Sequence, residues 1–130
     1  MSLRKQQSEF AEAIGKLIKY IYSFGYEVTF GDFQARNVNS LIDYLESTRP
    51  YLPDNMLLHL DNYINTLKKM RHSKHSRHYE RLAADLNLFK DGWYLTTTED
   101  HKIFGEYWES IGGTWGGRWN DGNHYSWGEK

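Results

Sequence analysis

The stretch LAADLNLF at residues 82–89 decides the predicted fold. Its apolar residues alternate with small or polar ones, which is the period of a β-strand that has one face in the core. Every second residue from Leu82 to Leu88 would form the core face, and Asp85 would lie on the opposite face among mostly small or polar neighbours. The pattern therefore predicts a strand that holds a carboxylate on its open face.

The residues after this strand predict a hairpin and then a helix. Residues 90–92 are a Lys-Asp-Gly turn signal, so residues 93–95 can return as a second strand. Thr96 and Glu99 have the spacing of a capping box that would start the helix. Gly112-Gly113 would end it.

Three helices and one strand are predicted on the N-terminal side. Apolar residues recur at helical spacing from about Ser8 to Phe24, and alternation with β-forming residues indicates a strand over residues 26–33. A short helix is expected at about residues 40–46, before a turn that contains two prolines. Asp54 or Asn55 can then cap a third helix. The inner face of this third helix would carry Met56, Leu57, Leu60, Ile64 and Leu67.

The tail of the chain completes the predicted sheet. Residues 114–127 are rich in glycine and aromatic side chains, which indicates a loop that leads into a short strand at residues 124–126. Together these patterns predict an α+β fold, in which the strands at 26–33, at 82–89 and near 124 form one small, mainly antiparallel sheet packed by helices. Asp85 and His124 should lie on the same face of that sheet.

Composition and charge narrow the class of protein. At 130 residues the chain has room for one moderate core, so we expect a single domain over residues 1–130. The net charge of −1 gives no reason to expect nucleic acid as a partner, and a metal site without cysteine must use His, Asp or Glu. No run approaches the roughly 18 apolar residues of a membrane span, and the N-terminus lacks the apolar stretch of a signal peptide. We expect a monomer that starts in the cytosol.

Two separated pieces of sequence together predict a metal site. His78 and Asp85 lie seven residues apart, and Asp121 precedes His124 by three. The two imidazoles and the Asp85 carboxylate suit a zinc ion that keeps an open position, which is typical of a catalytic zinc. Asp121 could then be the base that acts on water at the metal. The alternative for Asp121 is an ordinary turn residue in the Asn-Asp-Gly sequence.

The other histidines and the tryptophans have simpler explanations. His72 and His75 lie in a strongly basic stretch, where a solvated loop accounts for them without a ligand role. His59 and His101 fall within predicted helices, where a surface position is the ordinary outcome. Four of the five tryptophans fall within residues 108–127. For these we favour core packing, and a rim that binds sugar or peptide is the alternative.

The combined motifs resemble a known family. Ser76, His78 and Asp85, followed later by Asp121 and His124, look like the two motifs of the D-Ala-D-Ala metallopeptidases. That family includes the vancomycin-resistance dipeptidases and carboxypeptidases, and the L-alanyl-D-glutamate endopeptidases that bacteriophages use as endolysins.

The order of the surrounding elements also matches the family. A Gly-Tyr-x-Val-x-x-Gly-Asp sequence stands at residues 25–32, and the Trp-Gly-Gly-Arg-Trp sequence at residues 115–119 is similar to the version in phage endolysins. The resemblance covers roughly residues 8 to 127. The helix-rich segment at about 50–70 is longer than the usual linker and resembles an insertion.

The resemblance implies a role for each motif residue. Zn²⁺ would be held by the two histidines and Asp85, Asp121 would be the general base, Arg36 would steady the oxyanion, and Ser76 would help to orient the substrate. The chain departs from the family pattern at Arg81, where glycine is usual, and at residues 122–123, which are often aromatic. Arg36 stands one position later than the family's arginine.

The activity implied is hydrolysis of the stem peptides of peptidoglycan. We favour an endolysin of the L-alanyl-D-glutamate endopeptidase type, which would wait in the host cytosol until lysis and then act on the cell wall. A D-Ala-D-Ala carboxypeptidase or dipeptidase is the first alternative. A non-catalytic zinc-containing module that binds wall peptide is the second, and a nucleic-acid binder is a weaker third.

Overall fold

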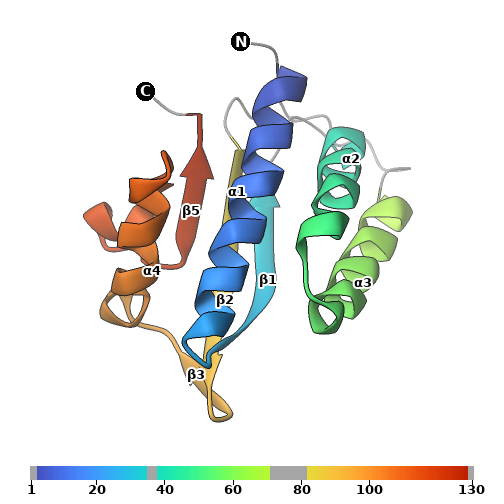
Figure 1. Ribbon diagram of the computed structural model, residues 1–130. Helices are drawn as coiled ribbons and strands as arrows, with labels where there is room; N and C mark the ends of the chain where they lie inside the picture. Colours follow the sequence, from blue (N-terminus) through green and yellow to red (C-terminus); the bar gives the residue numbers. More distant parts are fainter. Residues whose placement is uncertain (1–2, 35–37, 71–81, 129–130) are drawn as a thin grey trace.

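The computed structural model describes residues 3–34, 38–70 and 82–128, which form an α+β fold (Figure 1). The α-helices of these residues are α1 (Leu3–Ser23), α2 (Val38–Thr48), α3 (Asp54–Met70) and α4 (Thr98–Ser110). Two 3₁₀ helices are η1 (Arg49–Tyr51) and η2 (Gly116–Trp119). The strands are β1 (Glu27–Gln34), β2 (Leu82–Lys90), β3 (Trp93–Leu95), β4 (Thr114–Trp115) and β5 (His124–Trp127).

The strands form one antiparallel sheet, as predicted. Its order is β1-β2-β5-β4, and β3 pairs with β2 as the second strand of a hairpin. The register of β1 against β2 shifts between Phe30 and Phe33, which is a bulge in β1. β2 lies at the centre of the sheet, with β1 along one edge and β5 and β3 along the other, so these three strands surround its open face.

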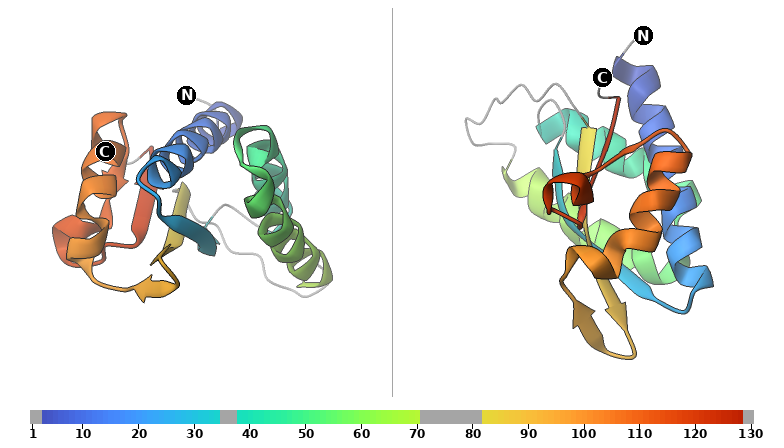
Figure 2. Two further views of the ribbon diagram at one scale, coloured as in Figure 1. Left: turned by 60° about the horizontal axis from the view of Figure 1, so that its bottom comes forward. Right: turned by 90° about the vertical axis from the view of Figure 1, so that its left-hand side faces the viewer.

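The helices cover one side of this sheet. α1 runs along the sheet and lies between α4 on one side and the α2–α3 pair on the other (Figures 1 and 2). The buried face of α1 consists of Phe10, Ile14, Leu17, Ile18 and Ile21. The predicted inner face of α3 is confirmed, since Met56, Leu60, Ile64 and Leu67 are buried and Leu57 is half-buried.

The facing of β2 is confirmed as well. Its core face is buried, with Leu82, Ala84, Leu86 and Leu88 at most 3% exposed. The Asp85 side chain, on the other face, is 33% exposed. The alternation in the sequence therefore sets which side of the sheet carries the carboxylate.

The N-terminal helix begins earlier than its apolar pattern indicates. α1 starts at Leu3 rather than near Ser8. Its first turns are rich in polar side chains such as Gln6 and Gln7, which give no apolar periodicity from which to read a helix.

The start of α4 differs from the prediction by one residue. The capping box uses Thr97 and Asp100, not Thr96 and Glu99: Thr97 Oγ1 accepts a hydrogen bond from the Asp100 amide at 3.1 Å, and the Thr97 amide donates to Asp100 Oδ2 at 3.2 Å. The run of three threonines allows both registers. Packing of the buried face of α4 sets the rotation of the helix, and this decides between them.

Two short elements in the tail were not predicted. They are β4 and η2, which together occupy residues 114–119 between α4 and the last strand. The predicted end of α4 is confirmed, because Gly112 has a φ of 108° directly after the helix. Within the described ranges, no helix is long and apolar enough to cross a membrane.

Candidate metal and catalytic site

Asp85 and His124 meet on the open face of the sheet. They are direct partners in the antiparallel ladder of β2 and β5, so their side chains project from the same face. Asp85 Oδ1 lies 3.4 Å from His124 Nδ1. The imidazole is buried, with 8% of its side chain exposed, while the carboxylate is partly open to solvent.

The separation of the two groups fits ligands of one metal ion. A charge-assisted hydrogen bond between them would be about 2.7–2.9 Å long. Two ligands joined to one tetrahedral zinc by bonds of about 2.1 Å lie about 3.4 Å apart. Among the described residues, His124 Nε2 is buried and has no hydrogen-bond partner, whereas the other ring nitrogen, Nδ1, faces the Asp85 carboxylate. Buried polar atoms are seldom left without partners, so Nε2 has a bonding capacity that the described residues do not use.

The remaining predicted residues of the site fall outside the described residues. Ser76 and His78 belong to the segment 71–81, and Arg36 belongs to the segment 35–37. Consistent with this, no three metal-binding side chains come together within residues 3–34, 38–70 and 82–128. The structure thus brings together two of the three predicted ligands.

The backbone at Asp121 is held close to His124. The Asp121 amide donates to the Gly116 carbonyl at 2.9 Å, and the Asp121 carbonyl accepts from the His124 amide at 3.1 Å. A Cβ atom on Gly116 would stand 2.3 Å from Asp121 O and 2.8 Å from the His124 Cβ, so only glycine fits here. The Asp121 side chain is exposed, which leaves its carboxylate open to water.

Two indole groups hold the ends of this loop. Trp115 Nε1 donates to the Gly122 carbonyl at 2.8 Å, and Trp108 Nε1 donates to the Ser126 carbonyl at 2.9 Å. Thr98 provides a third hydrogen bond, because its hydroxyl oxygen accepts from the Gly122 amide at 3.2 Å. These bonds join Gly122 to α4 and β4 and join Ser126 to α4. Trp108 and Trp115 are buried, as the core-packing interpretation predicts.

Trp119 departs from the core-packing prediction for the four clustered tryptophans, and it is a candidate contact residue. Its side chain is 52% exposed, and its ring centroid lies 6.1 Å from that of His124. The neighbouring Arg118 is held by Glu109 through two hydrogen bonds of 2.6 and 2.9 Å. This contact lowers the pKa of Glu109 and anchors η2 to α4. The available signal in the sequence was an aromatic residue in a glycine-rich segment near a predicted ligand.

His101 is not a surface residue, so that prediction is wrong. It is 2% exposed, and its Nδ1 lies 2.8 Å from the Tyr125 hydroxyl. Burial lowers the pKa of His101 to about 4 and raises the pKa of Tyr125. The reason is that His101 shares the buried face of α4 with Phe104 and Trp108. His59 is exposed, as predicted.

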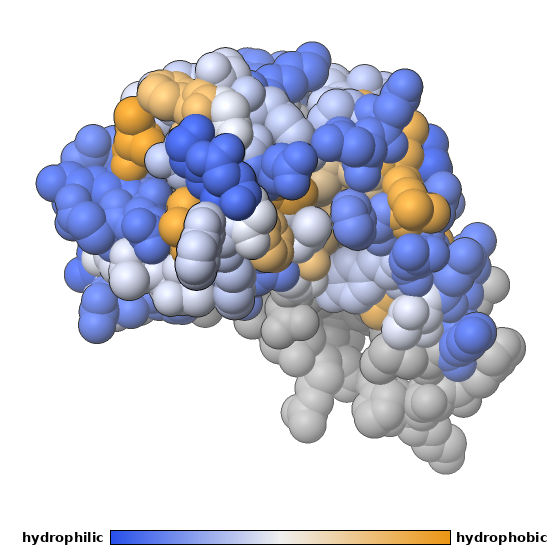
Figure 3. All heavy atoms as spheres, turned by 90° about the horizontal axis from the view of Figure 1, so that it is seen from below, coloured by the Kyte–Doolittle hydropathy of each residue, from blue (hydrophilic) through white to orange (hydrophobic). Residues whose placement is uncertain are grey.

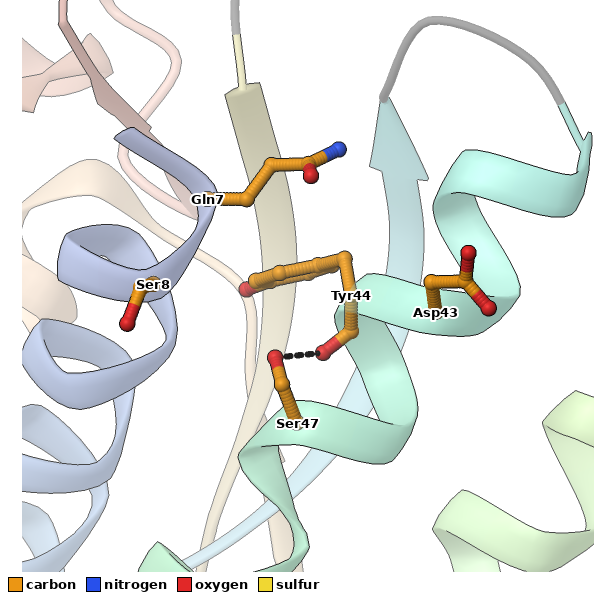
Figure 4. A pocket seen from close by; sticks show the side chains of 5 residues that line it. All are labelled: Gln7, Ser8, Asp43, Tyr44 and Ser47. Atoms are coloured by element: carbon orange, nitrogen blue, oxygen red, sulfur yellow. Dashed lines mark hydrogen bonds between the residues drawn. The ribbon is translucent and has the colours of Figure 1, made fainter. Parts of the chain in front are cut away.

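A separate pocket of about 280 Å³ lies between α1 and α2 (Figure 4). It is lined by Gln7, Ser8, Asp43, Tyr44 and Ser47. None of the predicted site residues lines this pocket, and it has no part in the proposed chemistry.

Comparison with known proteins agrees with the predicted class. Residues 70–127 match the model of a family described as D-alanyl-D-alanine carboxypeptidase. The matched range contains both motifs, from Ser76 to Asp85 and from Asp121 to His124, but not Arg36. Comparisons with curated proteins and with solved structures each found no match. The family match supports a peptidase that acts on peptidoglycan, and peptidases of this family are generally zinc-dependent.

Proposed function

We propose that the protein is a zinc peptidase that hydrolyses the stem peptides of peptidoglycan. In this proposal His78, Asp85 and His124 hold the metal and Asp121 is the general base. The observation that carries it is the Asp85–His124 pair, whose 3.4 Å separation suits two ligands of one ion. The matched family range adds support, because it includes both motifs.

The third ligand can come from the chain just before β2. His78 precedes Leu82 by four residues, and four extended residues span at most about 14 Å. Leu82 itself lies three residues from Asp85 along the strand, which is about 10 Å. A chain that turns back from Leu82 over the open face can therefore bring the His78 imidazole to the Asp85–His124 pair.

The proposed mechanism assigns a role to the metal site and to each of the other predicted residues. His78, Asp85 and His124 would hold the zinc, which would supply Lewis acidity toward a peptide carbonyl and toward water. Asp121 takes the proton of the attacking water and passes it to the leaving amine. Arg36 stabilises the negative charge that develops on the carbonyl oxygen, and Ser76 orients the substrate. We add Trp119 as a wall of the substrate site, since its exposed ring lies beside His124.

Two candidates for the cleaved bond follow from different observations. The Trp-Gly-Gly-Arg-Trp sequence at residues 115–119 resembles that of phage endolysins and favours the bond between L-alanine and D-glutamate. An endolysin would act on the host cell wall at lysis. The description of the matched family favours the terminal D-Ala-D-Ala bond instead.

Mass spectrometry of purified peptidoglycan treated with the protein tests both the activity and the bond. New amino termini at D-glutamate indicate the endopeptidase, and release of free D-alanine indicates the carboxypeptidase. A chelator should stop either reaction, and added zinc should restore it. His124→Ala should lose most of its bound zinc and its activity while it remains folded, because only three protein ligands are proposed. Hydrolysis by a zinc-free His124→Ala protein at the wild-type rate would refute the site.

A further inference from the structure

The open face of β2 continues from the candidate site to an aromatic surface. Because side chains alternate along a strand, Asn87 and Phe89 project from the same face as Asp85. Phe89 pairs directly with Tyr94 of β3, and their rings stack with centroids 5.2 Å apart. On β1, Thr29 pairs with Asn87 and the exposed Glu27 pairs with Phe89, so both lie on this face. We call Thr29, Asn87, Phe89 and Tyr94 the hairpin platform.

Hydrogen bonds give the hairpin platform a defined arrangement. The Tyr94 hydroxyl donates to Asn87 Oδ1 at 3.3 Å, and Asn87 Nδ2 donates to Thr29 Oγ1 at 3.3 Å. Tyr94 is nevertheless 55% exposed, and Phe89 is half-buried. The platform therefore presents aromatic carbon atoms and neutral polar groups to solvent at the hairpin end of the molecule. Figure 3 shows that end, where hydrophobic residues occur in small groups among hydrophilic ones.

Gly31 of β1 leaves space between the candidate site and the platform because it has no side chain. A Cβ atom on Gly31 would stand 3.2 Å from the Asp85 Cβ and 3.6 Å from Asn87 Nδ2. Without a side chain at this position, β1 adds no obstacle between Asp85 and Asn87. A bound molecule can therefore extend along β2 from the Asp85–His124 pair to Tyr94.

The chemistry of the hairpin platform suits a sugar. Its four side chains carry no charge, and the exposed carboxylate of Glu27, which pairs directly with Phe89 on the same face, disfavours the anionic backbone of a nucleic acid as the occupant. The C–H groups of a pyranose ring carry small positive charges, and they pack against the negative face of an aromatic ring. Amide and hydroxyl groups beside the rings can bond to sugar hydroxyl and N-acetyl groups.

The position of the platform fits a sugar that is joined to the peptide in the site. Phe89 lies four residues along β2 from Asp85, or roughly 13 Å. In peptidoglycan, one alanine and a lactyl link separate the glycan from the L-alanyl-D-glutamate bond, a length of about 7 Å. A disaccharide that starts there reaches the platform. The terminal bond of a pentapeptide stands about five residue lengths, or roughly 17 Å, from the glycan, which would place the sugar beyond Phe89.

We propose that the hairpin platform binds the N-acetylated disaccharide of the cell wall while its stem peptide occupies the Asp85–His124 site. This proposal rests on the proposed peptidase function, and it favours cleavage next to the glycan. It assigns substrate recognition to residues outside both catalytic motifs.

The test compares two substrates that differ only in the sugar. One is a stem peptide that carries its disaccharide, and the other is the same peptide without sugar. Tyr94→Ala should lower kcat/KM for the sugar-linked substrate about fivefold to tenfold, the scale of one lost aromatic contact. It should leave kcat/KM for the free peptide within about twofold, since surface changes elsewhere have small effects.

Trp93→Ala is the matched control. Trp93 is the adjacent residue of the same hairpin and is 75% exposed, but it pairs with Lys90 and so projects from the opposite face. Trp93→Ala should change kcat/KM for neither substrate. Equal losses on both substrates in Tyr94→Ala, or no loss on either, would overturn the platform.

A binding measurement separates this proposal from the peptidase itself. Titration with the free N-acetylated disaccharide, followed by NMR, should shift the Tyr94 and Phe89 ring signals in the wild type and in His124→Ala. Disaccharide binding without any hydrolysis by the wild type would refute the proposed peptidase function and support the hairpin platform. Hydrolysis of stem peptide without shifts of these ring signals would support the peptidase function and refute the hairpin platform.

Discussion

The N-terminal helices and the C-terminal segment of this protein are held by different kinds of contact. α1, α2 and α3 bury mainly aliphatic and aromatic side chains, as in the stacked rings of Phe10 and Tyr44. The segment 97–127 buries polar groups that form directed bonds. Its indole groups, Trp108 and Trp115, each donate to a backbone carbonyl.

This difference suggests that the helices mainly determine the stability of the fold, whereas the C-terminal segment mainly positions the residues of the site. Apolar burial depends on area and volume and has no preferred direction, so the helices can change in detail without moving the site. A hydrogen bond fixes distance and angle, so the loss of one donor can displace the loop that carries Asp121 and His124. We therefore expect changes in the helices to alter unfolding, and changes in the C-terminal segment to alter the reaction.

The largest effect should be that of Asp121→Asn on the rate. Asparagine keeps the size of the side chain but cannot accept the proton, and the loss of a general base typically costs about 10²–10⁴ in rate. Zinc content and thermal unfolding should not change, because Asp121 is not a proposed ligand and its side chain is exposed. Turnover of stem peptide and metal analysis of the same preparation measure both. A variant with the wild-type rate would show that Asp121 is only a turn residue.

Leu45→Ala should have the largest effect on stability. Leu45 of α2 is fully buried, and truncation of such a residue costs about 2–5 kcal/mol in the free energy of unfolding. At a temperature where the variant stays folded, kcat/KM should match the wild type. Leu58→Ala on α3, where the side chain is 65% exposed, is the control and should cost less than about 0.5 kcal/mol. A Leu45→Ala protein that is folded but inactive would show that packing in the helices also positions the catalytic residues.

His101 should make the C-terminal segment sensitive to acid. Its pKa is about 4 in the folded protein, against an ordinary value near 6.5. The unfolded chain therefore binds more protons between these two values, and stability should fall as the pH drops from about 6.5 to 4. The full loss is up to about 3 kcal/mol. Above pH 6.5 this residue contributes no pH dependence.

Denaturant unfolding as a function of pH measures this effect. His101→Gln should flatten the dependence between pH 6.5 and 4, because glutamine has no charge to bury. His59→Gln changes an exposed histidine and should leave the slope unaltered. Identical slopes in wild type and His101→Gln would contradict the assignment.

Trp115→Phe should lower both the stability and the rate, each by a small amount. It keeps an aromatic ring but leaves the Gly122 carbonyl without its donor, at a cost of about 1–3 kcal/mol. The freed loop should also lower kcat about tenfold, because displacements of about 1 Å near a reacting group are costly. Trp93→Phe, at an exposed indole, should change neither quantity. Wild-type kcat in a destabilised Trp115→Phe protein would show that the loop does not need this bond.

Much of the architecture and part of the site could be predicted from local patterns. Alternation along residues 82–89 predicted both the strand and the exposure of Asp85, because a period of two places alternate side chains on opposite faces. The spacing of apolar residues predicted the helices and the inner face of α3. The residue types of the two motifs predicted which chemistry to seek.

Other features were decided only by the tertiary structure. The capping register of α4 and the burial of His101 depend on which face of the helix packs against the core, and local preferences do not set that face. The pairing of Asp85 with His124, and the surface that joins Thr29, Asn87, Phe89 and Tyr94, depend on strand register. Register is set by contacts between segments far apart in the chain, whereas the sequence pattern carries the period and facing of each segment alone.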